Sequence, residues 1–393
     1  MTDPYHALDY DPAVTATLRR IGINAVFLEE RMGGLETYVR ELVPALLALR
    51  PELELRVYTS ARGRRLLERE AWADGIVVGH PLLGVPGTRA VVETTFLGWL
   101  ATRDRLDVLH NVALTAPLRT GPANVVLLAD VTWLRQPETV GRARAALWRM
   151  LVLPAARKAD RIITLSEAAR TEIVEDLRVP SSRVDVVPLG HGLSERVAPT
   201  PESELRSRLE LGSGPVVLAV SALTPHKNVR TLLEAIAIVR ETHPSVRLVI
   251  PGNPSAHGAE LERHAAGLGL QETVCFPGWV SEADLEGLYH AAACFVLPSL
   301  REGFGLPILE AMARDVPVAV AHASSLPEVA GDAALYFDPR DPRAMAEAIG
   351  RLVDDAELRD RLVVLGRART REFTWQRTAE ETLRSFERAR AGR

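Results

Sequence analysis

The sequence predicts an α/β protein with two domains, each built on a parallel sheet. Short apolar runs alternate with longer helical patterns along the chain, which is the order expected when helices connect parallel strands. The chain has 393 residues, which is long for a single core and suits two domains of ordinary size. A stretch rich in glycine, proline and charge, residues 189–214, interrupts the alternation near the middle and predicts a linker.

In the first half, six short apolar runs are predicted to be strands, because strands of a buried parallel sheet are apolar on both faces. A helix is predicted after the first of them, over Leu35–Leu49. The six predicted strands are Ile21–Phe27, Leu53–Tyr58, Val108–Leu109, Val125–Leu128, Ile162–Leu165 and Val184–Val187.

The second half repeats this arrangement after a predicted lead-in helix, Glu202–Leu211, and contains a further predicted helix over Val229–Glu241. We therefore expect two Rossmann-like domains, one over residues 1–192 and one over 193–374, followed by a last helix over Gln376–Ala389. The six predicted strands are Val216–Val220, Leu248–Ile250, Val274–Phe276, Phe295–Leu297, Val318–Val320 and Leu335–Phe337.

The composition excludes several classes of protein. Apolar residues make up 47% and charged residues 25% of the chain, as in soluble globular proteins. The net charge of −4 gives no reason to expect a nucleic-acid partner. The first eleven residues carry acids and no apolar core of a signal peptide, and no run approaches the length of a membrane span. We expect a cytoplasmic protein.

The segment from Ser299 to Ala311 carries the strongest chemical signal. It follows an apolar run, passes through two glycines and enters a helix at Pro307, a residue that fits the first helical turn. The glycines allow close approach of a ligand, and the free N–H groups of the new helix favour an anion. Glu302 precedes this anion site and Glu310 lies one turn inside the helix. That layout suits a nucleotide sugar; the alternative is a glycine turn whose carboxylates face water.

Two further loops have the pattern of phosphate-binding sites. Lys227 precedes a helix after the first strand of the second half, and it is one of only two lysines among 47 basic residues. An ammonium group there suits a diphosphate, while the alternative is a solvated lysine at a turn. Gly33 and Gly34 precede the helix that begins at Leu35 and predict a diphosphate or acceptor cradle, or a simple tight turn.

The thirteen residues from Ser299 to Ala311 resemble the signature of the retaining family-4 glycosyltransferases, a family that includes bacterial mannosyl-, glucosyl- and rhamnosyltransferases. In that signature seven residues separate two glutamates, as they separate Glu302 and Glu310 here. The resemblance covers nearly all of both halves. It implies the GT-B fold, in which two Rossmann-like domains face each other across the cleft that holds the active site. In that fold the last helix, here 375–393, crosses back to the first domain.

The resemblance also assigns residues, with two departures. Gly33-Gly34-Leu35 is similar to the family's first loop, and the main chain of Val280 lies where the family binds the nucleobase. A single histidine is more often structural than catalytic, but the family's histidine at the position of His110 points into the cleft near the donor sugar. Asp130 follows an alanine where the family often has histidine; it is expected to bind an acceptor hydroxyl or to accept its proton, or else to cap a helix. His226 replaces a common arginine.

These assignments imply a mechanism without a metal or other cofactor. Glu302 would hold hydroxyls of the donor sugar and stabilise positive charge at its anomeric carbon, and Glu310 would hold the ribose. Lys227 and the main-chain N–H groups of Gly303, Phe304, Gly305 and Leu306 would stabilise the departing diphosphate. The D-x-D pattern Asp9-Tyr10-Asp11 precedes the first strand and is not taken as a metal site. The donor is expected to be linked to UDP or GDP.

The expected partners are the nucleotide sugar and a sugar, lipid-linked or small-molecule acceptor. The stretch 141–158 has five basic residues, several apolar ones and no acid, which predicts either peripheral contact with an anionic membrane or a solvated basic face. Two alternatives to a transferase remain open. They are another enzyme of this fold, such as a sugar-nucleotide epimerase or a phosphorylase, and a non-catalytic sugar-nucleotide-binding subunit.

Overall fold

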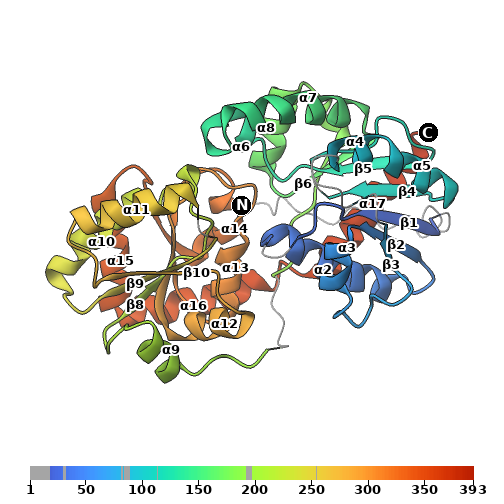
Figure 1. Ribbon diagram of the computed structural model, residues 1–393. Helices are drawn as coiled ribbons and strands as arrows, with labels where there is room; N and C mark the ends of the chain where they lie inside the picture. Colours follow the sequence, from blue (N-terminus) through green and yellow to red (C-terminus); the bar gives the residue numbers. More distant parts are fainter. Residues whose placement is uncertain are drawn as a thin grey trace.

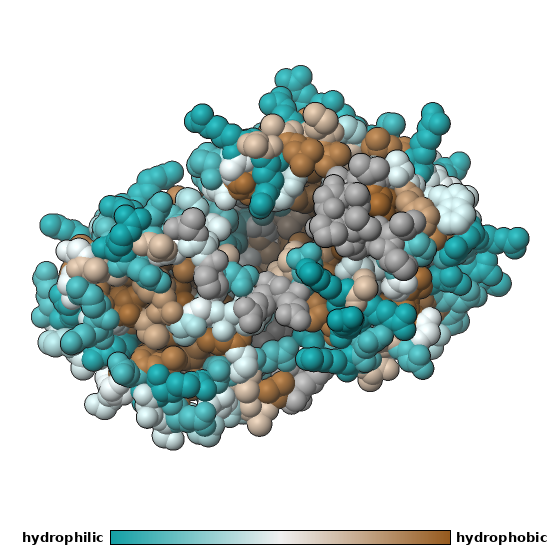
Figure 2. Space-filling model, in the orientation of Figure 1, coloured by the Kyte–Doolittle hydropathy of each residue, from teal (hydrophilic) through white to brown (hydrophobic). Residues whose placement is uncertain are grey.

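The computed structural model describes residues 18–29, 32–80, 83, 89–112, 114–191, 197–253 and 255–393. They form two α/β domains, each with one parallel sheet and helices packed on its faces (Figure 1). The predicted fold class is therefore confirmed. In the space-filling view a hollow lies between the two halves of the molecule (Figure 2).

The sheet of the first domain has seven strands in the order β3-β2-β1-β4-β5-β6-β7. The short edge strand β3, Val77–Gly79, was not predicted, because three half-buried residues give no periodic apolar signal. The other strands are β1 Arg20–Asn24, β2 Glu54–Thr59, β4 Val108–Asn111, β5 Ala123–Leu127, β6 Arg161–Thr164 and β7 Val184–Val186.

The sheet of the second domain has six strands in the order β10-β9-β8-β11-β12-β13, and all six were predicted. Its central strands are almost wholly apolar and buried on both faces, which explains why the sequence shows them as continuous apolar runs. The strands are β8 Val216–Leu218, β9 Arg247–Pro251, β10 Val274–Gly278, β11 Ala292–Leu297, β12 Val318–Ala321 and β13 Ala334–Phe337.

The helices of the first domain cover both faces of its sheet. Helix α2 spans Gly34–Leu49 and buries Tyr38, Val39, Leu42, Val43 and Leu46, which recur at helical spacing on one face. The others are α3 Ala61–Leu67, α4 Arg89–Thr94, α5 Phe96–Arg103, α6 Thr132–Arg135, α7 Arg142–Lys158 and α8 Glu167–Leu177, with the 3-10 turns η2 Pro137–Thr139 and η3 Ser181–Arg183. None of the helices in the described residues is long and apolar enough to cross a membrane.

The helices of the second domain begin with α9, Glu202–Arg208, the predicted lead-in helix. They continue with α10 Val229–Thr242, α11 Ala256–Gly267, α12 Glu282–Ala291, α13 Leu306–Ala313, α14 Leu326–Ala330, α15 Pro342–Asp354 and α16 Ala356–Thr370, with the 3-10 turns η4 Pro225–Lys227 and η5 Gly331–Ala333.

The last helix, α17 Trp375–Ala391, packs against the first domain, on α2 and strands β4, β5 and β6 (Figure 1). Asp185 of β7 fixes it there. The Asp185 carboxylate accepts hydrogen bonds from Ser385 Oγ at 2.7 Å and from an Arg388 guanidinium nitrogen at 2.6 Å, both on α17, and from Arg161 Nε at 2.8 Å. The chain thus passes between the domains twice.

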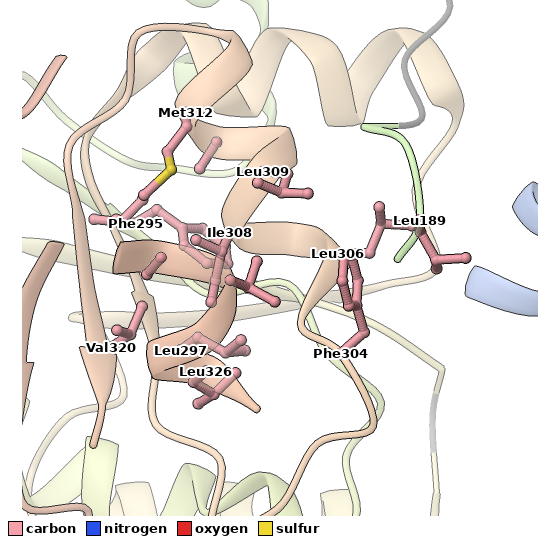
Figure 3. Close-up of a cluster of buried hydrophobic side chains, with 14 of the residues drawn as sticks. Leu189, Phe295, Leu297, Phe304, Leu306, Ile308, Leu309, Met312, Val320 and Leu326 are labelled. Carbon is pink, nitrogen blue, oxygen red and sulfur yellow. The ribbon is translucent and has the colours of Figure 1, made fainter. Parts of the chain in front are cut away.

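The two connecting segments touch each other. A Cβ added at Gly190 would lie 2.3 Å from the main-chain nitrogen of Trp375, so only glycine fits there. The His191 N–H donates to the Phe373 carbonyl at 3.1 Å. Leu189, in the same segment, lies beside Leu306 of the second domain (Figure 3). The predicted domain boundary after residue 192 falls in 192–196, outside the described residues, and stays a prediction.

Candidate active site

Two loops of the second domain meet where the strand order of its sheet reverses. Strands β8 and β11 are neighbours, and the order runs outward from them in both directions. The turn η4 with Lys227 lies in the loop after β8, and the loop with Glu302 follows β11. Open α/β sheets bind ligands beyond the carboxyl ends of their strands at such a switch point, so this is where a ligand is expected.

Lys227 and Glu302 form an ion pair at this point. Lys227 Nζ donates to Glu302 Oε1 at 2.7 Å and to Oε2 at 2.8 Å. The hydroxyl of Ser299, which is fully buried, donates to the same Oε1 at 2.7 Å. The two charged side chains keep 19% and 13% of their surface exposed, so the pair is firmly held but accessible to a ligand.

The sequence had assigned Lys227 to the diphosphate and Glu302 to the donor sugar, and the structure bonds these two side chains to each other. The carboxylate of Glu302 balances the charge that Lys227 was expected to offer to a diphosphate. An ammonium group has three N–H donors, and a phosphate can take the one not used by Glu302. Lys227 can therefore link the carboxylate to a bound diphosphate.

The main chain of the Glu302 loop is held by two serines from the loop after β12. The hydroxyl of Ser324 donates to the Glu302 carbonyl at 2.8 Å, and the single proton of the Ser325 hydroxyl lies between the carbonyls of Glu302 at 2.9 Å and Phe304 at 2.8 Å. Sequence reasoning missed the contribution of Ser299 to the site and assigned Ser324 and Ser325 mainly to structure. A run of hydroxyls beside a glycine loop is the signal that points to them, because hydroxyls bond to nearby main-chain groups.

Helix α13 begins as predicted for an anion site. Gly305 precedes it with φ +111°, a conformation that suits glycine, and has no side chain with which to cap the helix. The side chains of Phe304 and Leu306 are 4% and 8% exposed and belong to the core (Figure 3). Their predicted role in donor binding is therefore confined to main-chain N–H groups.

Gly303 lies directly against the first domain. A Cβ added there would lie 2.3 Å from the carbonyl oxygen of Ala129, which follows β5, and 2.8 Å from its carbonyl carbon. Main-chain atoms cannot move aside as a flexible side chain can. The loop of the second domain that contains Gly303 therefore packs directly against the main chain of the first-domain loop that precedes Asp130.

His226 lies beside this ion pair and its ring is mostly buried. Burial lowers the pKa of His226, and the neighbouring Lys227 ammonium lowers it further, while the carboxylates of Glu302 and Asp130 act in the opposite direction. A neutral imidazole at neutral pH follows. His226 therefore adds no permanent positive charge to the site.

Asp130 comes from the first domain and lies within electrostatic reach of His226. Its Oδ1 accepts a hydrogen bond from the main-chain N–H of Thr132 at 2.8 Å, at the start of α6. The side chain is partly exposed. The structure therefore brings Asp130 near His226, and the bond from Thr132 is an Asx turn that precedes α6, whose N-cap residue is Val131.

His110 does not point into the cleft, and that expectation is wrong. Its ring is fully buried, with Nε2 2.9 Å from the hydroxyl of Tyr38 and the ring centroid 5.2 Å from that of Phe386 on α17. Burial lowers the pKa of His110 to about 3. The return of α17 over β4 covers a strand end that the sequence alone leaves open, so His110 is a neutral core residue.

Glu310 lies on α13, and its Oε2 accepts a hydrogen bond from the hydroxyl of Tyr289 at 2.9 Å. Burial raises the pKa of Glu310, and the hydrogen bond from Tyr289 and the charge of Arg314 lower it. The Arg314 guanidinium stacks 4.7 Å above the Tyr289 ring and pairs with Glu286. Glu310 is thus fixed before any ligand binds, and its predicted contact with a ribose stays a prediction.

Val280 and the glycine pair lie at the outer parts of the site. Val280 is half-buried between β10 and α12 and packs against the core, which leaves its main chain at the edge of the sheet. Gly33 caps α2 with φ +64°, and a Cβ on it or on Gly34 would meet no atom of the described residues within 4 Å.

A metal site was not predicted. In the part of the chain that the structure describes, no group of three or more histidine, cysteine or acidic residues is arranged to hold a metal ion. Asp9-Tyr10-Asp11 lies outside the described residues.

Two parallel-sheet α/β domains with a charged site at a switch point define a class of protein that binds a ligand beyond the carboxyl ends of its strands, and comparisons with known proteins define the family. Residues 32–194 match Glycosyltransferase Family 4, and residues 202–369 match Glycosyl transferases group 1. The chain belongs to the family-4 glycosyltransferases and has the GT-B fold.

Individual relatives agree with this membership. The O-antigen chain mannosyltransferase B of Escherichia coli is 30% identical over 73% of this chain and 76% of its own. The D-inositol 3-phosphate glycosyltransferase of Frankia alni is 30% identical over 91% of this chain and 95% of its own. The crystal structure of Anabaena Alr3699/HepE in complex with UDP and glucose has a TM-score of 0.73, at 20% identity over 93% of this chain and 98% of that one.

Proposed function

We propose that this glycosyltransferase moves a hexose from a UDP- or GDP-linked donor to an acceptor hydroxyl, with retention of configuration and without a metal ion. The observation that carries the proposal is the Lys227–Glu302 pair at the switch point, beside the start of α13. The GT-B relative whose structure contains UDP and glucose supports a nucleotide sugar as donor.

The reaction breaks the bond between the anomeric carbon and the diphosphate, whose oxygen keeps the electron pair. The acceptor oxygen forms the new bond on the same face, and its proton passes to the departing phosphate oxygen or to Asp130. Three hydrogen bonds from Lys227 and Ser299 reduce the nucleophilicity of Glu302. That favours electrostatic stabilisation of the developing cation over a covalent intermediate.

Fixed positive potential is proposed to replace a divalent ion. Lys227, whose charge is shared with Glu302, supplies its remaining N–H donor, and the main-chain N–H groups at the start of α13 supply the positive end of a helix dipole. We expect transfer to survive EDTA, and Lys227→Ala to lose most of its turnover without rescue by added magnesium. Transfer that EDTA abolishes and magnesium restores would contradict this proposal.

The donor and the stereochemistry can be tested directly. A thermal-shift screen with UDP, GDP, ADP and dTDP identifies the nucleotide, and NMR of the product's anomeric proton gives the configuration. Glu310→Ala is expected to weaken binding of that nucleotide about tenfold or more, from the loss of charge-assisted bonds to the ribose. Tyr289→Phe keeps the carboxylate and serves as the control with nearly normal affinity.

A lipid-linked acceptor is proposed because of the exposed face of α7. Arg142, Arg144 and Arg149 are exposed there together with Leu147 at 49% and Met150 at 71%. A basic face with apolar side chains suits an anionic membrane surface. We expect co-sedimentation with vesicles that contain anionic lipid, and its loss when the three arginines are changed to glutamine. Equal binding by that variant would contradict the membrane contact.

A further inference from the structure

The start of helix α8, in the first domain, is capped by a residue of the second domain. The carboxylate of Glu328 accepts hydrogen bonds from the main-chain N–H groups of Glu167 at 2.8 Å and Ala168 at 2.7 Å. Ser166 caps the same end through a bond from Ala169 N to its Oγ at 3.1 Å, and that Oγ donates to the Gly303 carbonyl at 2.9 Å. One end of α8 is thus bonded to two separate loops of the other domain.

The residues on both sides of Glu302 also contact the first domain. Arg301 forms an ion pair with Glu172, one turn further along α8. Gly303 packs against the Ala129 carbonyl. Glu302 therefore sits between two residues that are held by the first domain, although Glu302 itself is bonded to residues of its own domain.

The loop with Glu328 is tied to Glu302 as well. Ser324 and Ser325, which precede α14, donate to the Glu302 carbonyl, and Glu328 lies in the first turn of α14. Glu328 and Glu302 are consequently parts of one bonded unit of the second domain. The packing of α8 on this part of the second domain therefore fixes the orientation of both Glu328 and Glu302.

We infer that Glu328 is a positioning residue for transfer. By capping α8 across the cleft, it holds the two domains in the arrangement that places Glu302 and the Lys227 ammonium opposite Asp130. The inference rests on the proposed role of Glu302 and goes beyond it, since it names the contact that assembles the site. The Arg301–Glu172 pair is the second part of this clamp.

A carboxylate at a helix N-terminus suits this task. It accepts two N–H groups that have no partner within the helix and interacts favourably with the helix dipole. Glutamine in place of Glu328 keeps the length but offers only one acceptor oxygen and no charge.

The test compares three Glu→Gln variants by kcat, KM and nucleotide affinity. Glu328→Gln and Glu172→Gln are expected to lower kcat about tenfold or more, the size of a lost charge-assisted contact. The dissociation constant for the nucleotide should stay within about twofold, because Lys227, Val280 and Glu310 all lie on the second domain. Glu175→Gln, on the same helix but paired only with exposed Arg135 of its own domain among the contacts described, is the matched control with normal kcat.

Small-angle scattering with the nucleotide bound gives an independent readout. Glu328→Gln should have a larger radius of gyration than the unchanged protein. A normal kcat in Glu328→Gln, or a loss of nucleotide affinity equal to the loss of kcat, would overturn the inference. Should Glu328→Gln not fold, a normal kcat in Glu172→Gln would overturn it equally. If the unchanged protein transfers no sugar from any nucleotide donor, the proposed function fails instead.

Discussion

Glu302 accepts three side-chain hydrogen bonds. Removal of its charge is therefore expected to change turnover and nucleotide affinity in different ways. Glu302→Gln keeps the size of the side chain but removes the negative charge beside the developing cation and releases the Lys227 ammonium. We expect kcat to fall at least about a hundredfold, a magnitude typical for the loss of one preorganised electrostatic contact. Affinity for the nucleotide should be unchanged or higher, because Lys227 becomes free to bind the diphosphate.

Steady-state kinetics and titration calorimetry with the nucleotide measure these two quantities separately. Ser299→Ala is the matched control, since it removes one neutral hydrogen bond to Glu302 and leaves the ion pair intact. Its kcat is expected to fall much less. Normal turnover in Glu302→Gln, or weaker nucleotide binding, would show that the ion pair has only a structural role.

His110 makes the folded protein sensitive to acid. Its pKa is lowered by burial to about 3 from the ordinary value of 6.5. Below pH 6.5 the unfolded chain takes up a proton that the folded chain does not, so stability falls as pH falls. Between pH 7 and pH 5 this amounts to about 2 kcal/mol.

The comparison of urea denaturation at pH 7, 6 and 5 for the unchanged protein and for His110→Asn isolates this contribution. The variant is expected to be less stable at pH 7, since it loses the contacts of the ring with Tyr38 and Phe386. The difference between the two proteins should shrink towards pH 5. A constant difference would mean that His110 takes up a proton in the folded state as readily as in the unfolded state, so that folding does not lower its pKa.

Among the elements, α17 makes a cluster of polar bonds to the first domain at the carboxylate of Asp185. Asp185 is 8% exposed and bonds to Arg161, Ser385 and Arg388. Asp185→Ala leaves the mostly buried Arg161 guanidinium without this partner, and such a loss costs about 3 kcal/mol or more. Urea denaturation measures the change, and Asp354→Ala, which removes a surface pair with His243, is expected to cost less than about 1 kcal/mol. Similar costs for the two variants would contradict the role of Asp185.

The elements that the sequence predicted are those with a strong apolar pattern. All the strands of the second sheet were found because both of their faces are buried, and α2 was found from its apolar stripe. The edge strand β3 was missed because its pairing with β2, rather than its composition, defines it. Glu302 and Lys227 were singled out by glycines and by position at strand ends, but their pairing depends on a loop conformation that no local pattern encodes.

At the scale of the whole molecule, packing between segments far apart in the chain determines the environments of residues that the sequence alone does not predict. His110 follows the same strand-end pattern as the loops of the site, and α17, which begins more than 250 residues later, covers it. Glu328, in the first turn of α14, and Ser166, the N-cap of α8, have no chemical signature of their own, and they matter because the two domains meet there. Contacts between domains are therefore the part of the site that one sequence predicts least.

The crossing of the two connecting segments is also a property of the whole molecule, and it can be tested at Gly190. A Cβ there would lie 2.3 Å from the Trp375 nitrogen and 2.7 Å from the Thr374 carbonyl carbon, and neither main-chain atom can move aside cheaply. Gly190→Ala should force the segments apart and cost about 1–3 kcal/mol, as overpacking does. Because both segments join the domains, the distance between Glu302 and Asp130 should change with them.

We therefore expect Gly190→Ala to lower kcat while the nucleotide still binds to the second domain with nearly normal affinity. Gly350→Ala is the matched control: a Cβ there meets no atom within 4 Å, and alanine in the interior of α15 stabilises a helix by about 1 kcal/mol. Kinetics, calorimetry and small-angle scattering on both variants test the idea. If Gly190→Ala keeps normal kcat and an unchanged radius of gyration, the crossing does not set the arrangement of the domains, and the contacts of α8 alone must do so.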